Sequence, residues 1–173
     1  NGEEDEYYSD FWRYNAVQNF WQEVAPFPGL ARSAAVAFSI NGFGYVGTGY
    51  DGDDELKDFY RYDPNANAWT KIADFIGSPR RNAVAFSIAG KGYVGTGDDG
   101  NTLKDFYEYD PSTDSWEQIT SIGGSKRVNA VSFVIGNYAY VATGSDNGTL
   151  ETDLWRFDPT LLPDFPWVEM TDL

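Results

Sequence analysis

A unit of 47 or 48 residues recurs along this chain and limits its possible folds more than any local feature does. An aspartate, an aromatic residue and a tryptophan each return in one register, and only the last tryptophan interval, at 51 residues, departs from the period. These markers are Asp10, Asp58, Asp105 and Asp153; Tyr14, Tyr62, Tyr109 and Phe157; and Trp21, Trp69, Trp116 and Trp167. Three independent markers in one register predict a repeat architecture.

Each unit contains four short segments with the composition of β-strands, and none shows a long helical period. In the first segment small residues alternate with bulky ones as AVAFSI, which predicts a strand buried on both faces. The Asn41-Gly42 pair that follows is a tight hairpin signal. Four antiparallel strands per unit are typical of a propeller blade. In the first complete unit we expect strands over 35–40, 44–48, 56–62 and around Trp69.

The motifs of the unit resemble those of the kelch repeat. Pro79-Arg80 precedes the first strand, the second strand ends in glycines, and Asp-aromatic-aromatic, Tyr-Asp-Pro and a tryptophan follow. The resemblance covers residues 9–168. The sequence pattern AVAFSI…GYVGTG…LKDF is similar to that of kelch-like surface lipoproteins of Bacteroidetes-type bacteria. One departure is that the family's double glycine appears as Gly-Thr-Gly at 47–49 and 95–97, and as Ala-Thr-Gly at 142–144.

The predicted fold is all-β: a kelch-type β-propeller segment of about three and a half four-stranded blades. Because closed propellers typically have about four to eight blades, the chain does not close on itself. Further blades beyond Leu173, a second copy of the chain, or a longer chain of which this is one part could complete the ring. We favour further chain, which makes the segment part of a larger closed propeller. The predicted parts are an acidic leader (1–8), an outer half-blade (9–25) and three blades (30–75, 80–121 and 127–170).

Composition excludes several classes of site and partner. The chain has no cysteine and no histidine, which removes disulfides, thiolate or imidazole metal sites, and the copper site of kelch oxidases. The net charge of −15 disfavours nucleic acid and anionic membranes. No apolar run reaches the length of a membrane span. The resemblance implies a lipid anchor upstream of residue 1 and an extracellular or outer cell-surface location.

Candidate ligand-binding residues gather on one propeller face, where loops between second and third strands meet the segments before the first strands. Arginines at this face could bind carboxylates through two hydrogen bonds. Their recurrence in every blade favours the alternative of a structural role, in which they hydrogen-bond a neighbouring segment. The candidates are Arg32, Arg80, Arg127, Tyr50, Asp51, Asp98, Asp99, Asp146 and Asn147.

The acidic loops in this set also suggest calcium as the one conceivable cofactor, because several carboxylates stand within five residues. Their spacing does not match an EF-hand, and glycine with aspartate is ordinary turn chemistry, so we assign no metal ligands. The repeated aspartates before each third strand, such as Asp58, are expected to accept hydrogen bonds that hold a loop.

Two classes of function fit these observations. The first is a non-catalytic binding or scaffold module on the cell surface, which uses one propeller face for a protein or glycan ligand. In eukaryotic kelch domains, the matching face commonly binds peptides. The alternative is a carbohydrate-active enzyme such as a sialic acid mutarotase, whose chemistry needs only acid, base and binding groups. No asymmetric set of reactive residues marks a catalytic site, so none is assigned.

Overall fold

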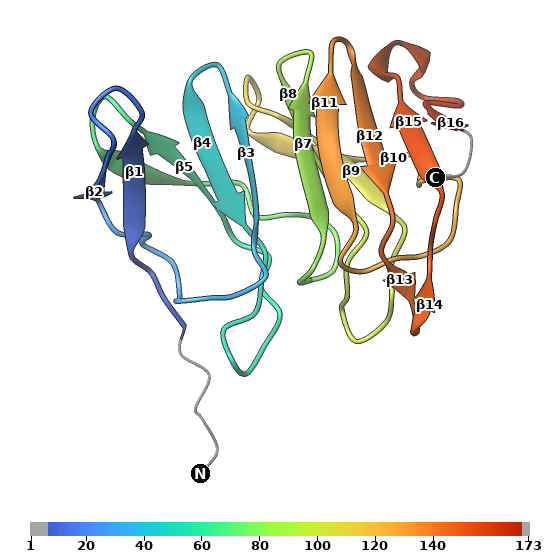
Figure 1. Ribbon diagram of the computed structural model, residues 1–173, viewed down its shortest axis with the longest axis horizontal. Helices are drawn as coiled ribbons and strands as arrows, with labels where there is room; N and C mark the ends of the chain where they lie inside the picture. Colours follow the sequence, from blue (N-terminus) through green and yellow to red (C-terminus); the bar gives the residue numbers. More distant parts are fainter. Residues whose placement is uncertain (1–6, 171–173) are drawn as a thin grey trace.

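Three four-stranded antiparallel sheets and the two-stranded sheet of β1 and β2 stand side by side (Figure 1). The computed structural model describes residues 7–170. The blades run β3-β4-β5-β6, β7-β8-β9-β10 and β11-β12-β15-β16, after a half-blade of β1 and β2. Their bounds are β1 Phe11–Asn15, β2 Phe20–Val24, β3 Val36–Ile40, β4 Phe43–Gly47, β5 Phe59–Asp63, β6 Ala68–Ile72, β7 Val84–Ile88, β8 Lys91–Gly95, β9 Phe106–Asp110, β10 Ser115–Ile119, β11 Val131–Ile135, β12 Tyr138–Ala142, β15 Leu154–Phe157 and β16 Trp167–Glu169.

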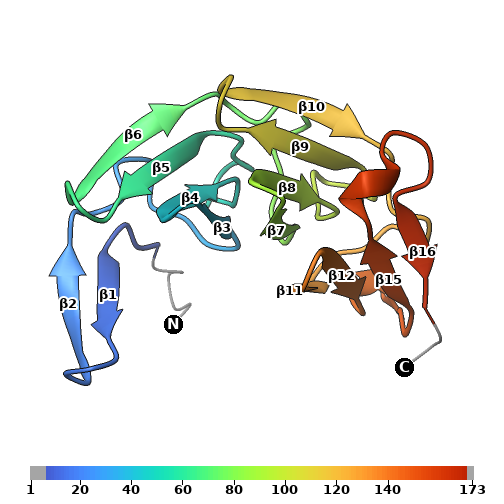
Figure 2. The same ribbon diagram turned by 90° about the horizontal axis from the view of Figure 1, so that it is seen from above.

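Seen from above, the sheets form an open arc (Figure 2). The first strand of each blade (β3, β7 and β11) lies on the inside of the arc, and the fourth (β6, β10 and β16) lies on the outside. The half-blade β1-β2 stands at one end and the blade ending in β16 at the other, with no strand joining them. The predicted all-β segment of about three and a half blades is therefore confirmed.

The third strand of the first complete blade begins later than its sequence suggested. In the first complete blade β5 starts at Phe59, whereas the apolar pattern placed the strand start at Leu56. The N–H of Leu56 donates to the Gly49 carbonyl at 2.8 Å, and its own carbonyl accepts from the N–H of Arg80 at 3.1 Å. Both backbone groups of Leu56 are thus used by the loop and cannot join the strand ladder.

Aromatic side chains fill the space between neighbouring blades. Phe38 and Tyr45 stack on each other with ring centroids 5.1 Å apart, and Tyr45 also contacts Tyr109 of the next blade at 5.7 Å. Trp116 packs on Phe59 with a centroid distance of 4.9 Å and donates its indole N–H to the Ala73 carbonyl at 3.1 Å. These rings bury large apolar areas in tilted or stacked geometry, which holds one sheet against the next.

The innermost strand β3 is buried on one face only, which corrects the prediction of two buried faces. Val36, Phe38 and Ile40 point toward the next blade and are at most 9% exposed. Ala37 and Ser39 point the other way and are exposed. On that side the neighbouring half-blade has no inner strands to cover them.

The last blade leaves the opposite, bulky face of its inner strand uncovered. Phe133 and Tyr140 form a stacked pair at 5.2 Å that repeats the Phe38–Tyr45 pair. Phe133 is 43% exposed and Ile135 is 63% exposed, because no further blade lies against them. The open arc therefore ends in side chains that are buried at its internal junctions.

Two predicted segments outside the strands are the long loop at 159–166 and the acidic leader. The longer loop at 159–166 contains the 3-10 helix η1 (Pro159–Leu161) and folds back onto the preceding blade, where Thr120 donates its hydroxyl to the Pro163 carbonyl at 2.6 Å. Residues 1–6 of the predicted acidic leader lie outside the described residues. Of its last two residues, Tyr7 contacts the Tyr50 ring at a centroid distance of 6.2 Å, and Tyr8 pairs with Arg32 in an isolated bridge. Within residues 7–170, we find no helix with the length and apolar character needed to cross a membrane.

Candidate functional site

One face of the arc is built from loops, and it lies at the lower edge of Figure 1. The loop face comprises the segments before β3, β7 and β11 together with the β4–β5, β8–β9 and β12–β15 loops, the last of which includes the short strands β13 (Ser145–Asp146) and β14 (Thr149–Leu150). Isolated bridges join a segment to a loop in every blade, pairing Ser33 with Tyr50, Arg81 with Asp98 and Val128 with Ser145. The expected meeting of these loops on a single face is observed.

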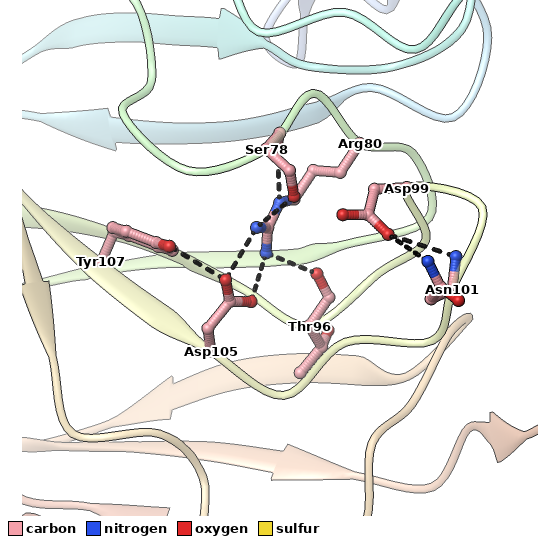
Figure 3. A network of polar contacts seen from close by, with 7 residues as sticks. All are labelled: Ser78, Arg80, Thr96, Asp99, Asn101, Asp105 and Tyr107. Atoms are coloured by element: carbon pink, nitrogen blue, oxygen red, sulfur yellow. Dashed lines mark hydrogen bonds and ion pairs between the residues drawn. The ribbon is translucent and has the colours of Figure 1, made fainter.

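The side chain of Arg80 forms its hydrogen bonds with its own blade and with Ser78 in the segment just before that blade (Figure 3). Its Nη1 donates to the Thr96 carbonyl at 3.0 Å and to Asp105 Oδ1 at 2.7 Å, and its Nη2 donates to Asp105 Oδ2 at 2.9 Å. Ser78 accepts two further hydrogen bonds, from Nε to its carbonyl and from Nη2 to its hydroxyl. The side chain is 0% exposed, so all five of its donor sites face the protein.

The same arginine brace, an arginine before the first strand paired with an aspartate before the third, occurs in all three complete blades. Arg32 pairs with Asp58 at 2.6 and 3.0 Å, and Arg127 pairs with Asp153 at 2.6 and 2.7 Å. Their side chains are 4% and 0% exposed. The expectation that these arginines bind ligand carboxylates does not fit this geometry, because internal carboxylates already occupy both arms of each guanidinium.

The braces shift the acidity of groups around them. The hydrogen bond from Arg127 lowers the pKa of Asp153, and the indole of Trp155 adds a second donor at 2.6 Å. Burial raises the pKa of Tyr107 to about 12, helped by its hydrogen bond to Asp105. Both shifts arise from the ion pair and its surroundings, which is the pattern of a structural network.

The acidic loops use their carboxylates to close their own turns. Asp51 Oδ1 accepts the N–H groups of Asp53 and Asp54 at 3.0 and 2.8 Å, and these bonds lower the pKa of Asp51. Asp98 accepts from the N–H of Gly100 at 2.8 Å. Such turns are an ordinary use of aspartate beside glycine.

The remaining candidates of the acidic loops also bind within their own loops. Asp99 accepts from the N–H of Asn101 at 3.1 Å; burial alone would raise its pKa, but hydrogen bonds from Ser78 and Asn101 lower it. Asn147 donates to Asp146 at 2.9 Å. Among residues 7–170 no three carboxylate-bearing side chains converge in a way that could hold a metal ion. The calcium alternative therefore has no converged ligand set in this part of the chain.

Arg81, which the sequence motifs did not single out, connects two blades on the loop face. Its guanidinium carbon lies 4.6 Å from the centre of the Tyr50 ring, and its nitrogens lie 3.6 Å from Glu55 and 3.6 Å from Asp98. The side chain is 34% exposed, unlike that of Arg80 beside it. Alignment of the repeats would have revealed it, because Ser33 and Val128 occupy the equivalent positions.

Comparison with known proteins agrees with this geometry. A family model described as the KLHDC2/KLHL20/DRC7 Kelch-repeats domain matches residues 1–127. The chain belongs to the kelch-repeat family. A solved structure described as "Structure of YjhT" has a TM-score of 0.82 and 20% identity, over 95% of this chain and 60% of that chain. This kelch segment therefore spans less than two thirds of that protein, and the likeness shows the fold alone. No curated protein sequence matches the chain.

The turn at the kelch double-glycine position places a backbone carbonyl that the brace arginine binds. The threonine that replaces a glycine adopts a left-handed conformation, with φ of 57° at Thr48 and 60° at Thr96, and the following Gly49 has φ of 102°. This turn directs the Thr48 carbonyl toward Arg32, whose Nη1 donates to it at 2.9 Å. A Cβ on Gly49 would lie 2.7 Å from the Ser33 carbonyl, so only the first glycine of the pair is replaceable here.

Proposed function

We propose that this kelch segment is a non-catalytic binding module and that its ligand contacts the loop face around Tyr50 and Arg81. The observation that carries the proposal is the break in repeat symmetry at Arg81, which is partly exposed and spans two blades. Repeated residues mainly maintain a scaffold, whereas a residue present in one blade can select a ligand. The three braced arginines then position the loops and do not contact the ligand.

The chemistry of the loop face favours a polar ligand, either a protein with a basic patch or a glycan. One half-exposed guanidinium stands beside an aromatic ring and an excess of carboxylates, which gives both stacking and hydrogen-bonding groups. The chain's net charge of −15 would speed association with a basic partner. The polar candidates expected to contribute are the acidic Asp51, Asp98, Asp99 and Asp146 and the neutral Asn147.

We further propose that the segment acts outside the cell or on its surface as part of a larger closed propeller. Its resemblance to kelch-like surface lipoproteins supports this location, and its open arc supports the need for further blades. The catalytic alternative, a sialic acid mutarotase, has less support. The arginines expected to hold a sugar carboxylate are bound to Asp58, Asp105 and Asp153.

The experiment is a selection followed by mapping. A glycan array and a displayed peptide library would be screened with the chain, and each binder would be titrated into isotopically labelled protein by NMR. We expect shifts at Tyr50, Glu55, Arg81 and Asp98. Binders that perturb only the opposite hairpins, around Asn41-Gly42 and Ala89-Gly90, would contradict the proposal, as would the absence of any binder in both screens.

A further inference from the structure

A cavity of about 590 Å³ opens between the second and third blades, where the segment before β11 meets β15 and β16. Its volume lies within the range of small-molecule sites, roughly 300 to 1,000 Å³. The lining residues that matter here come from three segments: Gly123 and Gly124 before β11, Glu151 and Thr152 before β15, and Trp155 and Glu169 on β15 and β16. None of them is among the contacts of Arg81, so the cavity is separate from the Tyr50–Arg81 surface.

An enlarged aromatic residue lines this cavity. Trp155 stands two residues after the brace aspartate, where the preceding blade has Tyr107. Its indole N–H donates to Asp153 at 2.6 Å, which orients the ring, and the residue is only partly buried. A Cβ on Gly123 would lie 2.4 Å from this ring, whereas Ile76 occupies the same position, four residues before the brace arginine, at the preceding junction. The glycine therefore makes room for the larger indole, which forms part of the cavity wall.

The charge around this aromatic position changes sign from blade to blade. Three positions are involved: the two residues before the brace aspartate, and the residue that faces the aromatic one on the fourth strand. They are Leu56, Lys57 and Lys71 in the first complete blade, Leu103, Lys104 and Gln118 in the second, and Glu151, Thr152 and Glu169 in the third. Two positive charges in the first blade thus become one in the second and two negative charges in the third.

The two glutamates of the third blade are available to a ligand. Within residues 7–170 neither the Glu151 nor the Glu169 carboxylate takes part in an ion pair or a side-chain hydrogen bond. The third carboxylate at the cavity, that of Asp153, is bound by both arms of Arg127. The cavity therefore presents two uncompensated negative charges together with an indole ring.

We propose that this cavity binds an alkylammonium group, supplied by a free polyamine or by a lysine side chain of a partner protein. The carboxylates of Glu151 and Glu169 attract the ammonium, and tryptophan is the aromatic residue that attracts a cation most strongly. The methylene stem of such a ligand packs against the indole and the glycine backbone. A neutral sugar would gain nothing from the loss of the lysines found in the other blades, so the charge reversal favours a cation over a glycan.

The first experiment follows the indole N–H signal of Trp155 by NMR, with Trp155→Tyr used to assign it. Two probes are titrated into the isotopically labelled chain: spermidine, and the peptide Gly-Gly-Lys-Gly-Gly with blocked ends. We expect saturable one-to-one shifts at Trp155 and at the amides of Gly123 and Gly124. Tighter binding of spermidine assigns the site to a free polyamine, and tighter binding of the peptide assigns it to a protein partner. Acetylation of the lysine amine removes the charge and should abolish any shifts that the peptide causes.

Substitutions that restore the residue of another blade test the charge argument while keeping the repeat pattern. Thr152→Lys returns the lysine of the first two blades, and we expect it to weaken binding about tenfold or more by repelling the ammonium. Glu169→Gln returns the residue of the second blade and should weaken binding about threefold or more, as expected for a partly exposed ion pair. Circular dichroism and the melting temperature verify that both variants remain folded.

Matched controls separate the cavity from the general acidity of the chain. Glu23→Gln on β2 removes one negative charge outside the cavity and should leave the affinity within about twofold, because solvent and salt screen a distant exposed charge. Arg81→Ala should likewise leave the affinity for the probes within about twofold, since the two sites share no residue. A failure at the cavity and a failure of the Tyr50–Arg81 proposal therefore give different results.

Three results would overturn the proposal. The first is the absence of a shift at Trp155 with either probe at about 10 mM, a concentration that nearly saturates a site with a Kd of about 1 mM. The second is binding that Thr152→Lys leaves unchanged or that Glu23→Gln weakens equally, which would indicate an adventitious counter-ion only. The third is equal binding of the acetylated peptide, which would show that the ammonium charge does not select the ligand.

Discussion

Arg80 and Asp105 form a two-armed ion pair, with distances of 2.7 and 2.9 Å, that joins the start of one inner strand to the start of the third strand of the same blade. The arginine side chain is 0% exposed and the aspartate side chain 23% exposed. Two further blades repeat this pair. The loops of the candidate site therefore stand on a charged scaffold whose guanidinium groups are already bound by carboxylates of the same chain.

A double-mutant cycle on this pair tests its structural role. We expect Arg80→Met and Asp105→Leu each to lower the free energy of unfolding by about 3 kcal/mol, because each leaves the partner charge unpaired. Because the Asp105 side chain is 23% exposed, we expect the loss in unfolding free energy to lie at the low end of the range for buried ion pairs. The double variant is expected to lose less than the sum, as urea unfolding would show. Additive losses would mean that the two side chains act independently.

Stability at acid pH is expected to depend on Asp153. The hydrogen bond from Arg127 lowers the pKa of Asp153 in the folded chain. The ionised carboxylate therefore contributes its full share to the free energy of unfolding above the unfolded pKa of about 4, and this share disappears as the pH falls through the lower folded pKa. Asp153→Asn should cost about 2 kcal/mol at pH 7 and progressively less below pH 4. Urea unfolding at several pH values measures this, with Asp164→Asn in the exposed C-terminal loop as the control. A cost that does not change with pH would refute the assignment.

Gly124 tests how tightly the third brace is packed. A Cβ at this position would lie 2.6 Å from Arg127 Nη2, from Asp153 Oδ2 and from the Trp155 indole nitrogen. We expect Gly124→Ala to lower the unfolding free energy by about 2 to 3 kcal/mol through this crowding. Gly136→Ala is the control, since its Cβ meets nothing within 4 Å and only its φ of 60° costs about 1 kcal/mol. Equal losses in the two variants would show that the brace tolerates displacement.

Calcium is expected to have little effect on thermal stability. The carboxylates of Asp51 and Asp98 bind backbone N–H groups of their own loops, and no three acidic side chains converge within the described chain. Calcium at 1 mM should therefore shift the melting temperature by less than about 1 °C, because a ligand present below its dissociation constant stabilises the folded state little. Magnesium and a chelator serve as the comparisons. A larger shift that the chelator reverses would restore the calcium site to the loop face.

The sequence alone predicts the blade architecture well, because most of its aromatic markers are buried residues at a fixed period. Trp116 and Trp167 are 7% and 8% exposed, and each donates its indole N–H to a carbonyl of the preceding blade. Because such contacts recur in each blade, the residues that make them recur too, and the repeat period can be read from the sequence. The limits of β5 were less predictable, since Leu56 has the composition of a strand but uses its backbone in a loop.

The candidate site was predicted only in part, and for a physical reason. Arg80 and Asp105 both recur, but composition does not show that they bind each other, although their separation of 25 residues, against 26 in the other blades, could have suggested it. Arg81 belongs to no repeat marker, and its contacts with Tyr50 and Glu55 depend on how two blades are placed. Interactions across a blade junction require the three-dimensional arrangement.

The most direct test of the binding proposal is the effect of Arg81→Ala on both affinity and stability, measured with a ligand selected on the glycan array or peptide library. The Arg81 ion pairs are long and partly exposed, so their loss should change the unfolding free energy by less than about 1 kcal/mol. The affinity should fall about tenfold or more, as expected for a charged contact at a binding face. Unchanged affinity in a variant that folds normally would contradict the assignment of the loop face as the binding site.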